Sequence, residues 1–469
     1  EPLGRCFGVG SSPGDFSYGD RVNPASVSPG AAANQPSSVR GHVLNRFTPD
    51  VSAAFPGPDW MCDRRASAAA GLADVAPPDV GEEVWRYSRI DELDLDRFSP
   101  SIVRPDAGTS VDATLAGPAA ATVILCDGWI EAVHVSDAAV EAGVSIGSVA
   151  DMEDGADLHG AVLEAPVDLF GHLNRAFCPE PLAVVVPDGV RLDGPVVVVS
   201  HVVTEGVAAF PRLLVHCGAD AEALVIEIQT SDDVESLVAP VLEATVGRAG
   251  RLRHAVLQEL GPRVWQLAHQ EVHIEQGASG DLFHAGLGGD YARTRTDCRL
   301  VGRGAEGRIT AAYFGVGEQG LDYRTFQEHA APDTVSELLF KGALDDSSRS
   351  VYTGLIRVRP EAVRTRAIQT NRNIKLSPDA WAESVPNLEI ETDDVMCSHA
   401  STVSPVDVEQ RFYLESRGVP TVVAERLLLE GFFAEVVAAA PHPEVASRLR
   451  RGLVAKLDRH TTVGERGPA

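Results

Sequence analysis

The sequence is poor in positive charge, which argues against several kinds of partner. Of its 469 residues, 67 are acidic and 40 are basic, so the net charge is −27, and only three residues are lysines (Lys341, Lys375 and Lys456). A field of this sign repels phosphate backbones unless a local basic patch opposes it, and the sequence shows no such patch. We therefore expect no nucleic-acid partner.

Long apolar runs are missing as well. No run reaches the roughly 18 to 20 residues that a membrane-spanning helix needs, although the hydrophobic content of 44% is ordinary for a globular protein. The first residues also lack the charged start and apolar centre of a secretory signal. We therefore expect a protein that has no membrane contact and is cytoplasmic.

Paired cysteines are the third absence. The seven cysteines form no CxxC pair and lie far apart: Cys6, Cys62, Cys126, Cys178, Cys217, Cys298 and Cys397. An odd number at such spacing does not suit a disulfide framework. We expect reduced thiols, most of them buried as small hydrophobic residues.

Common catalytic motifs are absent too. There is no GxxxxGK[ST] phosphate loop and no HExxH pair, so neither ATP hydrolysis nor zinc-protease chemistry is expected by those routes. Matches to GxSxG (10–14 and 143–147) and GxGxxG (302–307 and 315–320) lack the strand and helix context that these motifs require, so we interpret them as chance. The sequence therefore predicts no complete enzyme active site.

Four regions differ in texture. Residues 1–44 are rich in Gly, Pro, Ser and Ala and are predicted to be a disordered tail. Residues 45–176 mix short helices with brief strands, as in a helical and α/β region. Residues 177–403 consist of short β-branched runs bounded by Gly, Asp or Pro. Residues 404–469 are predicted to be helical.

A short glycine motif recurs within the β-rich region. Its copies are Gly218-Ala-Asp-Ala, Gly247-Arg-Ala-Gly, Gly277-Ala-Ser-Gly and Gly304-Ala-Glu-Gly, spaced 29, 30 and 27 residues apart. Recurrence at this interval is typical of stacked coils, with glycine supplying the positive φ of a tight corner. It predicts a parallel β-helix. A β-sandwich remains the alternative, although it does not require similar corners at a near-constant interval.

The last region should begin with a capped helix. Ser404 is the expected N-cap, followed by a proline at the first helical position and by Asp407 at the third. Further helices are predicted for 421–440 and 443–459, the second of them amphipathic. Such a helical end can cap the β-helix or dock a partner.

Cys397 and His399 form the best candidate site. They lie two residues apart in a strand-like segment, so a thiol and an imidazole would share one face. Both are suitable ligands for iron or zinc, and two ligands leave room for others from a partner. On spacing alone, a buried cysteine beside a surface histidine is the commoner explanation.

Three other histidines are predicted to be structural. His269 and His273 would share a face if their segment is a strand, and we interpret that face as exposed and polar. His329 lies past the last copy of the glycine motif, so we expect it on an excursion from the coil.

The C-terminal third closely resembles the SufB/SufD family, and weaker similarity extends over about 45–460. The similar segments are Gly342-Ala-Leu-Asp-Asp, Tyr352-Thr-Gly-Leu-Ile356, Gln369-Thr-Asn-Arg-Asn373, Pro386-Asn-Leu-Glu-Ile390, Asp393-Asp-Val-Met-Cys-Ser-His399, Phe412-Tyr-Leu-Glu-Ser-Arg-Gly418 and Glu430-Gly-Phe-Phe433.

This resemblance implies a mainly β fold and a role in iron–sulfur cluster assembly. It implies a right-handed parallel β-helix core flanked by an N-terminal α/β-helical region and a C-terminal α-helical region. It implies pairing with SufB through the β-helix and docking of the SufC ATPase on the C-terminal helices (404–469), with a homodimer possible for the chain alone. ATP hydrolysis would then be the work of SufC, and this chain a scaffold subunit rather than an enzyme.

Within the family, the resemblance is to SufD. SufB carries a cysteine in a Gly-Asp-Lys-Cys-type segment, where this chain has Asn371-Arg-Asn-Ile-Lys-Leu-Ser377. Cys397 and His399 match the Cys-Ser-His motif of SufD, which implies binding of transient iron or a nascent iron–sulfur cluster shared with SufB, with none held stably. Ala400 and Ser401 replace the usual Gly-Ala and would narrow the space beside His399.

Two other functions stay open at this point. One is a SufB-like homodimer that assembles clusters alone, against which the missing cysteine counts. The other is a β-helix carbohydrate enzyme or acyltransferase, which a cleft lined with carboxylates would support.

Overall fold

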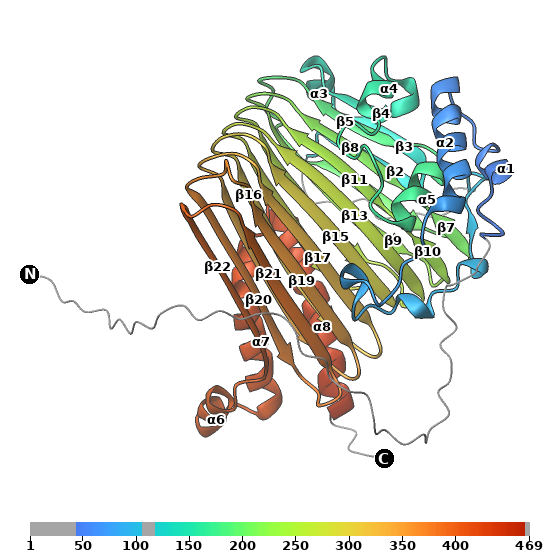
Figure 1. Ribbon diagram of the computed structural model, residues 1–469. Coiled ribbons are helices and arrows are strands. Elements are labelled where there is room, and N and C mark those ends of the chain that lie inside the picture. Colours follow the sequence, from blue (N-terminus) through green and yellow to red (C-terminus); the bar gives the residue numbers. More distant parts are fainter. Residues whose placement is uncertain (1–43, 106–117, 465–469) are drawn as a thin grey trace, which may run out of the picture. The chain divides into compact units, whose positions relative to one another are not determined.

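The computed structural model describes residues 44–105 and 118–464, with side chains described to residue 458. The predicted disordered tail (1–44) lies outside these residues, apart from Leu44. The chain folds into about eight turns of a parallel β-helix, with an α/β region before it and helices after it (Figure 1). This confirms the predicted fold class.

The strands of the β-helix alternate between two sheets. In each sheet a strand pairs in parallel with the strand one coil before it and the strand one coil after it. The coils of the first sheet are β5 (Leu182–Val186), β8 (Arg212–Cys217), β11 (Val241–Val246), β13 (Val264–Ile274), β15 (Tyr291–Leu300), β17 (Gly320–His329), β19 (Arg349–Val358) and β21 (Trp381–Ile390). Those of the second sheet are β6 (Val196–Val202), β9 (Glu222–Ser231), β12 (Arg251–Glu259), β14 (Ser279–Gly286), β16 (Glu306–Gly315), β18 (Val335–Leu344), β20 (Thr365–Lys375) and β22 (Val395–Pro405).

The glycine motif does mark the corners, but its glycines serve two purposes. Gly277 (φ 65°) and Gly304 (φ 72°) adopt the expected positive φ. In the two preceding coils, Asp220 (φ 56°) and Ala249 (φ 58°) take that conformation instead. Gly247 is needed because a Cβ there would lie 2.8 Å from a backbone nitrogen of the coil before it. The predicted recurrence of corners is therefore confirmed, whereas a positive φ explains only some of the glycines in the motif.

The N-terminal region extends both sheets and covers the outer face of the first. Large apolar residues from this region, among them Phe55, Trp85 and Phe177, belong to one buried apolar cluster with the sheet residues Trp265 and Tyr291. Its strands are β1 (Ser99–Pro100), β2 (Ala121–Cys126), β3 (Trp129–Val135) and β4 (Ser145–Ser148), and the short strands β7 (Val207–Ala209) and β10 (Ser236–Val238) lie beside the first sheet. Its helices are α1 (Pro49–Ser52), α2 (Asp59–Gly71), α3 (Asp137–Glu141), α4 (Gly155–Leu158) and α5 (Leu169–Phe177).

Three helices follow the last strand of the β-helix: α6 (Val408–Ser416), α7 (Thr421–Ala438) and α8 (Pro443–Gly464), drawn in red in Figure 1. Of these, α7 and α8 cover the outer face of the second sheet, whereas α6 packs on α7. Leu429 and Phe433 of α7 and Leu449 of α8 pack against apolar residues of that sheet. None of the helices in the described part of the chain is both long and apolar enough to cross a membrane.

Two local expectations were wrong. Ser404 is not an N-cap, because β22 continues to Pro405 and the side chain of Asp407 instead accepts the backbone N–H groups that begin α6. His329 is not on an excursion, because it ends β17 and is fully buried. Its ring nitrogens bond to the hydroxyls of Thr334 (2.8 Å) and Ser336 (2.9 Å).

Candidate functional site

The last coil of the β-helix is open. β21 and β22 end the two sheets, and each pairs along one edge only among the described residues. The residues of β22 are mostly exposed on both faces, in contrast to the buried residues of the coils before it. Unpaired strand edges of this kind are a ready template for another chain.

Cys397 and His399 lie together on this last strand. In the parallel register Cys397 is opposite Ala367 and His399 is opposite Gln369, both of which are buried inside the β-helix. The two side chains therefore share the face that continues the interior, as the two-residue spacing predicts. Cys397 packs beside the apolar cluster of the final coils, while His399 is exposed at its open end.

The departure at Ala400 and Ser401 has a smaller effect than expected. Alternation along β22 places only Ser401 on the face of His399, opposite Asn371. Ala400 is on the other face. A single hydroxyl is therefore added next to the candidate ligands.

The state of the thiol follows from its surroundings. Burial raises the pKa of Cys397, although a hydrogen bond with the backbone of Ala367 lowers it. The group is therefore a thiol at neutral pH, and a bound metal ion would have to displace its proton. The deeply buried cysteines are less available still, since burial raises the pKa of Cys178 to about 11 and that of Cys298 to about 12.

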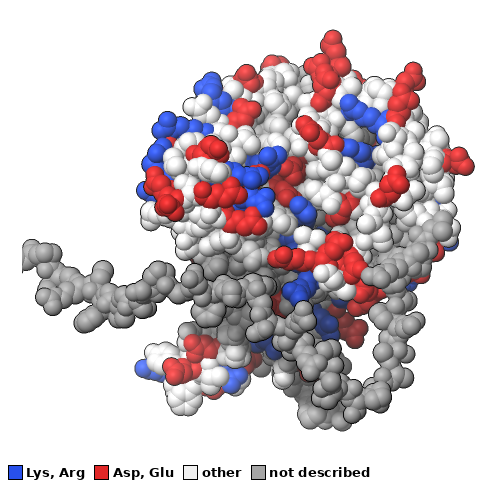
Figure 2. All heavy atoms as spheres, in the orientation of Figure 1, with Lys and Arg blue, Asp and Glu red and all other residues white. Residues whose placement is uncertain are grey.

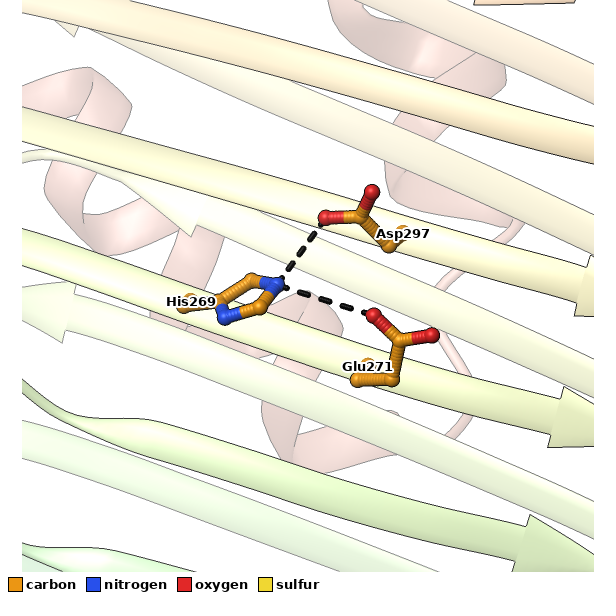
Figure 3. Close-up of side chains that lie close together, drawn as sticks. All are labelled: His269, Glu271 and Asp297. Carbon is orange, nitrogen blue, oxygen red and sulfur yellow. Dashed lines mark hydrogen bonds and ion pairs between the residues drawn. The ribbon is translucent and has the colours of Figure 1, made fainter. Parts of the chain in front are cut away.

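One group of three potential metal ligands occurs in residues 44–105 and 118–458, and it lies elsewhere. It consists of His269, Glu271 and Asp297 (Figure 3). Our interpretation of His269 and His273 as members of an exposed polar face was wrong for His269, which is buried and bonded to Asp297. The sequence shows the His-x-Glu-x-His spacing of residues 269–273. Nothing in the sequence indicates that Asp297, 28 residues after His269, lies beside it.

Apolar residues are exposed on the first two C-terminal helices. Phe412 of α6 is 68% exposed and its neighbour Tyr413 57%. Val408, Val422, Val423 and Leu427 are also exposed, and we call these six residues the α6–α7 surface. Because α6 and α7 are in contact, these exposed aromatic and aliphatic side chains make the two helices a candidate contact with another protein.

A groove lies between α8 and the corners of the coils. It has a volume of about 950 Å³, and several carboxylates line it. Glu259 is paired with Arg448 (2.8 Å), and Asp290 with Arg89 (2.9 Å). These ion pairs fasten outer elements to the coils, so they explain the two carboxylates without a catalytic role.

Acidic and basic side chains are interspersed on the face of the molecule drawn in Figure 2, with no continuous basic patch there.

Residues 200–432, which include the candidate ligands, match the family model described as SUF system FeS cluster assembly, SufBD core domain. The chain is 33% identical over 283 residues to an iron–sulfur cluster assembly SufBD family protein of Mycobacterium tuberculosis, spanning 59% of this chain and 68% of that protein. It is 29% identical to the iron–sulfur cluster assembly protein SufD of Escherichia coli (77% of this chain, 85% of that protein). It is 25% identical to the chloroplastic protein ABCI7 of Arabidopsis thaliana (86% and 87%).

Proposed function

The chain belongs to the SufBD family of iron–sulfur cluster assembly proteins, and from this we propose that it is a SufD-type scaffold subunit that works with a SufB and a SufC partner. The similarity to SufD over most of the chain supports that branch of the family. So does the absence of a cysteine between Asn371 and Ser377. We expect the complex to act in the cytoplasm.

One observation carries the proposal: Cys397 and His399 share a face at the open end of the β-helix. A sister subunit that pairs with the free edges of β21 and β22 would bring its own side chains to this face. Iron or a nascent cluster is then the cargo, held by the Cys397 sulfur once its proton is lost, by one His399 nitrogen and by ligands from SufB.

The C-terminal helices provide the second contact. The α6–α7 surface exposes aromatic and aliphatic residues beyond the part of α7 that packs on the second sheet. We assign it to the SufC ATPase, whose ATP-driven movements would reach the β-helix through α7. Hydrolysis belongs to SufC, and this chain contributes no catalytic residue to it.

The test is cluster content in the assembled complex. The chain is co-expressed with SufB and SufC, purified without oxygen and assayed for iron and sulfide. His399→Ala should lower the iron content of the complex severalfold. His134→Ala is the matched control, because His134 is an exposed histidine of β3, at the opposite edge of the same sheet.

The outcomes separate the parts of the proposal. Equal iron content in both variants would remove the site assignment while leaving the scaffold role. Full cluster assembly by this chain without SufB would instead favour the homodimeric, SufB-like alternative. Failure to retain SufC and SufB would contradict the scaffold role itself.

A further inference from the structure

A second set of potential metal ligands lies on the outer face of the first sheet. His269 and Glu271 are on β13, and Asp297 is on β15 in the next coil (Figure 3). The parallel register places Glu271 directly opposite Asp297, and His269 shares the face of Glu271 two residues earlier. The Nε2 atom of His269 is 2.9 Å from Oδ2 of Asp297 and 3.7 Å from Oε2 of Glu271.

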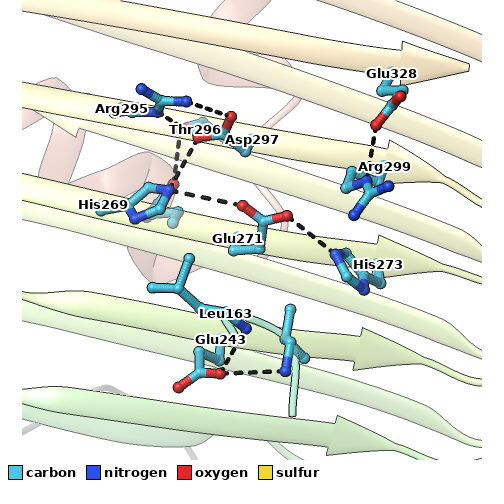
Figure 4. Close-up of polar contacts among 12 residues, drawn as sticks. Leu163, Glu243, His269, Glu271, His273, Arg295, Thr296, Asp297, Arg299 and Glu328 are labelled. Atoms are coloured by element: carbon cyan, nitrogen blue, oxygen red, sulfur yellow. Dashed lines mark hydrogen bonds and ion pairs between the residues drawn. The ribbon is translucent and has the colours of Figure 1, made fainter. Parts of the chain in front are cut away.

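Other side chains hold the far oxygen of each carboxylate (Figure 4). Arg295 Nη2 donates to Oδ1 of Asp297 (2.9 Å), and Oε1 of Glu271 is 3.0 Å from Nε2 of His273. One oxygen of each carboxylate is thus left facing His269. Such outer partners are what orient the ligands in known metal sites. Arg295 also donates Nε to Oδ2 of Asp297 (2.6 Å), a bond that an incoming cation would replace.

A third carboxylate nearby, that of Glu243, is not available as a metal ligand because its oxygens already accept other hydrogen bonds. Glu243 lies opposite Glu271 on the preceding coil. One of its oxygens accepts from Arg212 and the other from the backbone N–H groups of Val162 and Leu163. The chain therefore offers three donors here, and water would complete the coordination.

Charge and access both suit a cation. Two carboxyl groups, those of Glu271 and Asp297, lie near the single guanidinium of Arg295. The side chains of His269, Glu271 and Asp297 are 5%, 10% and 14% exposed, which leaves them reachable from solvent but largely dry.

We propose that His269, Glu271 and Asp297 bind one divalent first-row transition-metal ion, such as Fe²⁺, Mn²⁺, Co²⁺ or Zn²⁺. Ligands about 2.0–2.2 Å from a metal lie roughly 3.0–3.5 Å from one another, and the observed separations of 2.9 and 3.7 Å bracket that range. Mixed imidazole and carboxylate donors favour these ions over Mg²⁺ and Ca²⁺, which prefer oxygen alone. The site is separate from Cys397 and His399 and does not depend on the proposed function.

The experiment is a Co²⁺ titration of the untagged full-length chain, followed by visible absorption. Cys397→Ser and His399→Ala are introduced first, so that binding at the open coil does not contribute. One Co²⁺ per chain should bind, and Zn²⁺ should displace it. His269→Gln and Glu271→Gln should each weaken binding by about tenfold or more, since even outer partners of a metal site contribute about that much.

His216→Gln is the matched control. His216 lies on the same face two coils before His273, and its ring bonds to Thr245 (2.8 Å). Its replacement should leave Co²⁺ affinity unchanged. Equal affinity in the parent, His269→Gln and Glu271→Gln would overturn the proposal, as would a parent that binds no Co²⁺. Circular dichroism identifies a variant that fails to fold, and the other ligand variant then decides the outcome.

Discussion

Asp322→Asn should show how strongly the N-terminal region is fastened to the β-helix. Asp322 lies on β17 and is fully buried. It accepts hydrogen bonds from the hydroxyl of Tyr291 (2.7 Å) and from the guanidinium groups of Arg293 (3.0 Å) and Arg324 (2.5 Å). Burial raises the pKa of this carboxyl, but the two arginines outweigh it and lower the pKa, so the group is a buried anion.

The two arginines carry the connection outward. Arg293 donates to the backbone carbonyl of Val84 (2.6 Å) and lies over the ring of Trp85 (3.9 Å). Arg324 donates to the carbonyl of Arg86 (2.7 Å). Loss of the central anion leaves two buried guanidinium groups uncompensated. Breaking such a pair usually destabilises a protein by about 3–5 kcal/mol, and because asparagine keeps one acceptor we expect about 3 kcal/mol.

Urea unfolding measures the loss of stability, and amide hydrogen exchange shows where it occurs. The rate of amide hydrogen exchange should rise most in residues 83–87, because Arg293 and Arg324 bond to backbone carbonyls of this segment. Asp333→Asn is the control, because Asp333 also pairs with two arginines, Arg303 and Arg364, but at a partly exposed corner. Surface ion pairs contribute little. The reasoning would be refuted if Asp322→Asn lowered the free energy of unfolding by no more than Asp333→Asn does.

Two further predictions concern pH and partner binding. Burial lowers the pKa of His329 to about 4 from 6.5, so between these values only the unfolded chain takes up the proton and stability falls as the pH falls. When the pH is lowered from about 7 to 4.5, the free energy of unfolding, measured with urea, should fall by roughly 2–3 kcal/mol less for His329→Gln than for the parent. An equal fall in both proteins would contradict this. Phe412→Ser should reduce SufC co-purification about tenfold, as expected for an aromatic anchor, whereas Val140→Ser, at an exposed residue of α3, should not.

The β-helix was predictable because its signals are local. A tight corner in each coil restricts the residues that fit there, so corners recur in the sequence at the length of a coil. The shared face of Cys397 and His399 was predictable for a similar reason, since alternation along a strand depends on nothing outside it.

Burial by distant segments was not predictable in this way. His269 has the polar neighbours of an exposed strand face, yet it is 4% exposed in the folded chain. The backbone N–H of Leu163, about a hundred residues earlier, bonds to Glu243 on the coil before His269, so a distant segment lies against this face of the sheet. Likewise, Ser404 has the sequence of a helix cap, but pairing with β20 keeps it in a strand. In both cases tertiary contacts outweigh a local preference.

The same geometry explains why the two candidate metal sites differ in what they need. A residue in the middle of a solenoid has neighbours from the coils on both sides. Glu271 therefore lies beside Asp297 of the next coil, and one chain supplies all three potential ligands. Spacing motifs within a strand cannot reveal such a set. Cys397 and His399 are on the last coil, with a neighbouring strand on one side only. In the proposed site the remaining ligands would therefore come from the sister subunit that we propose at the free edge of β22.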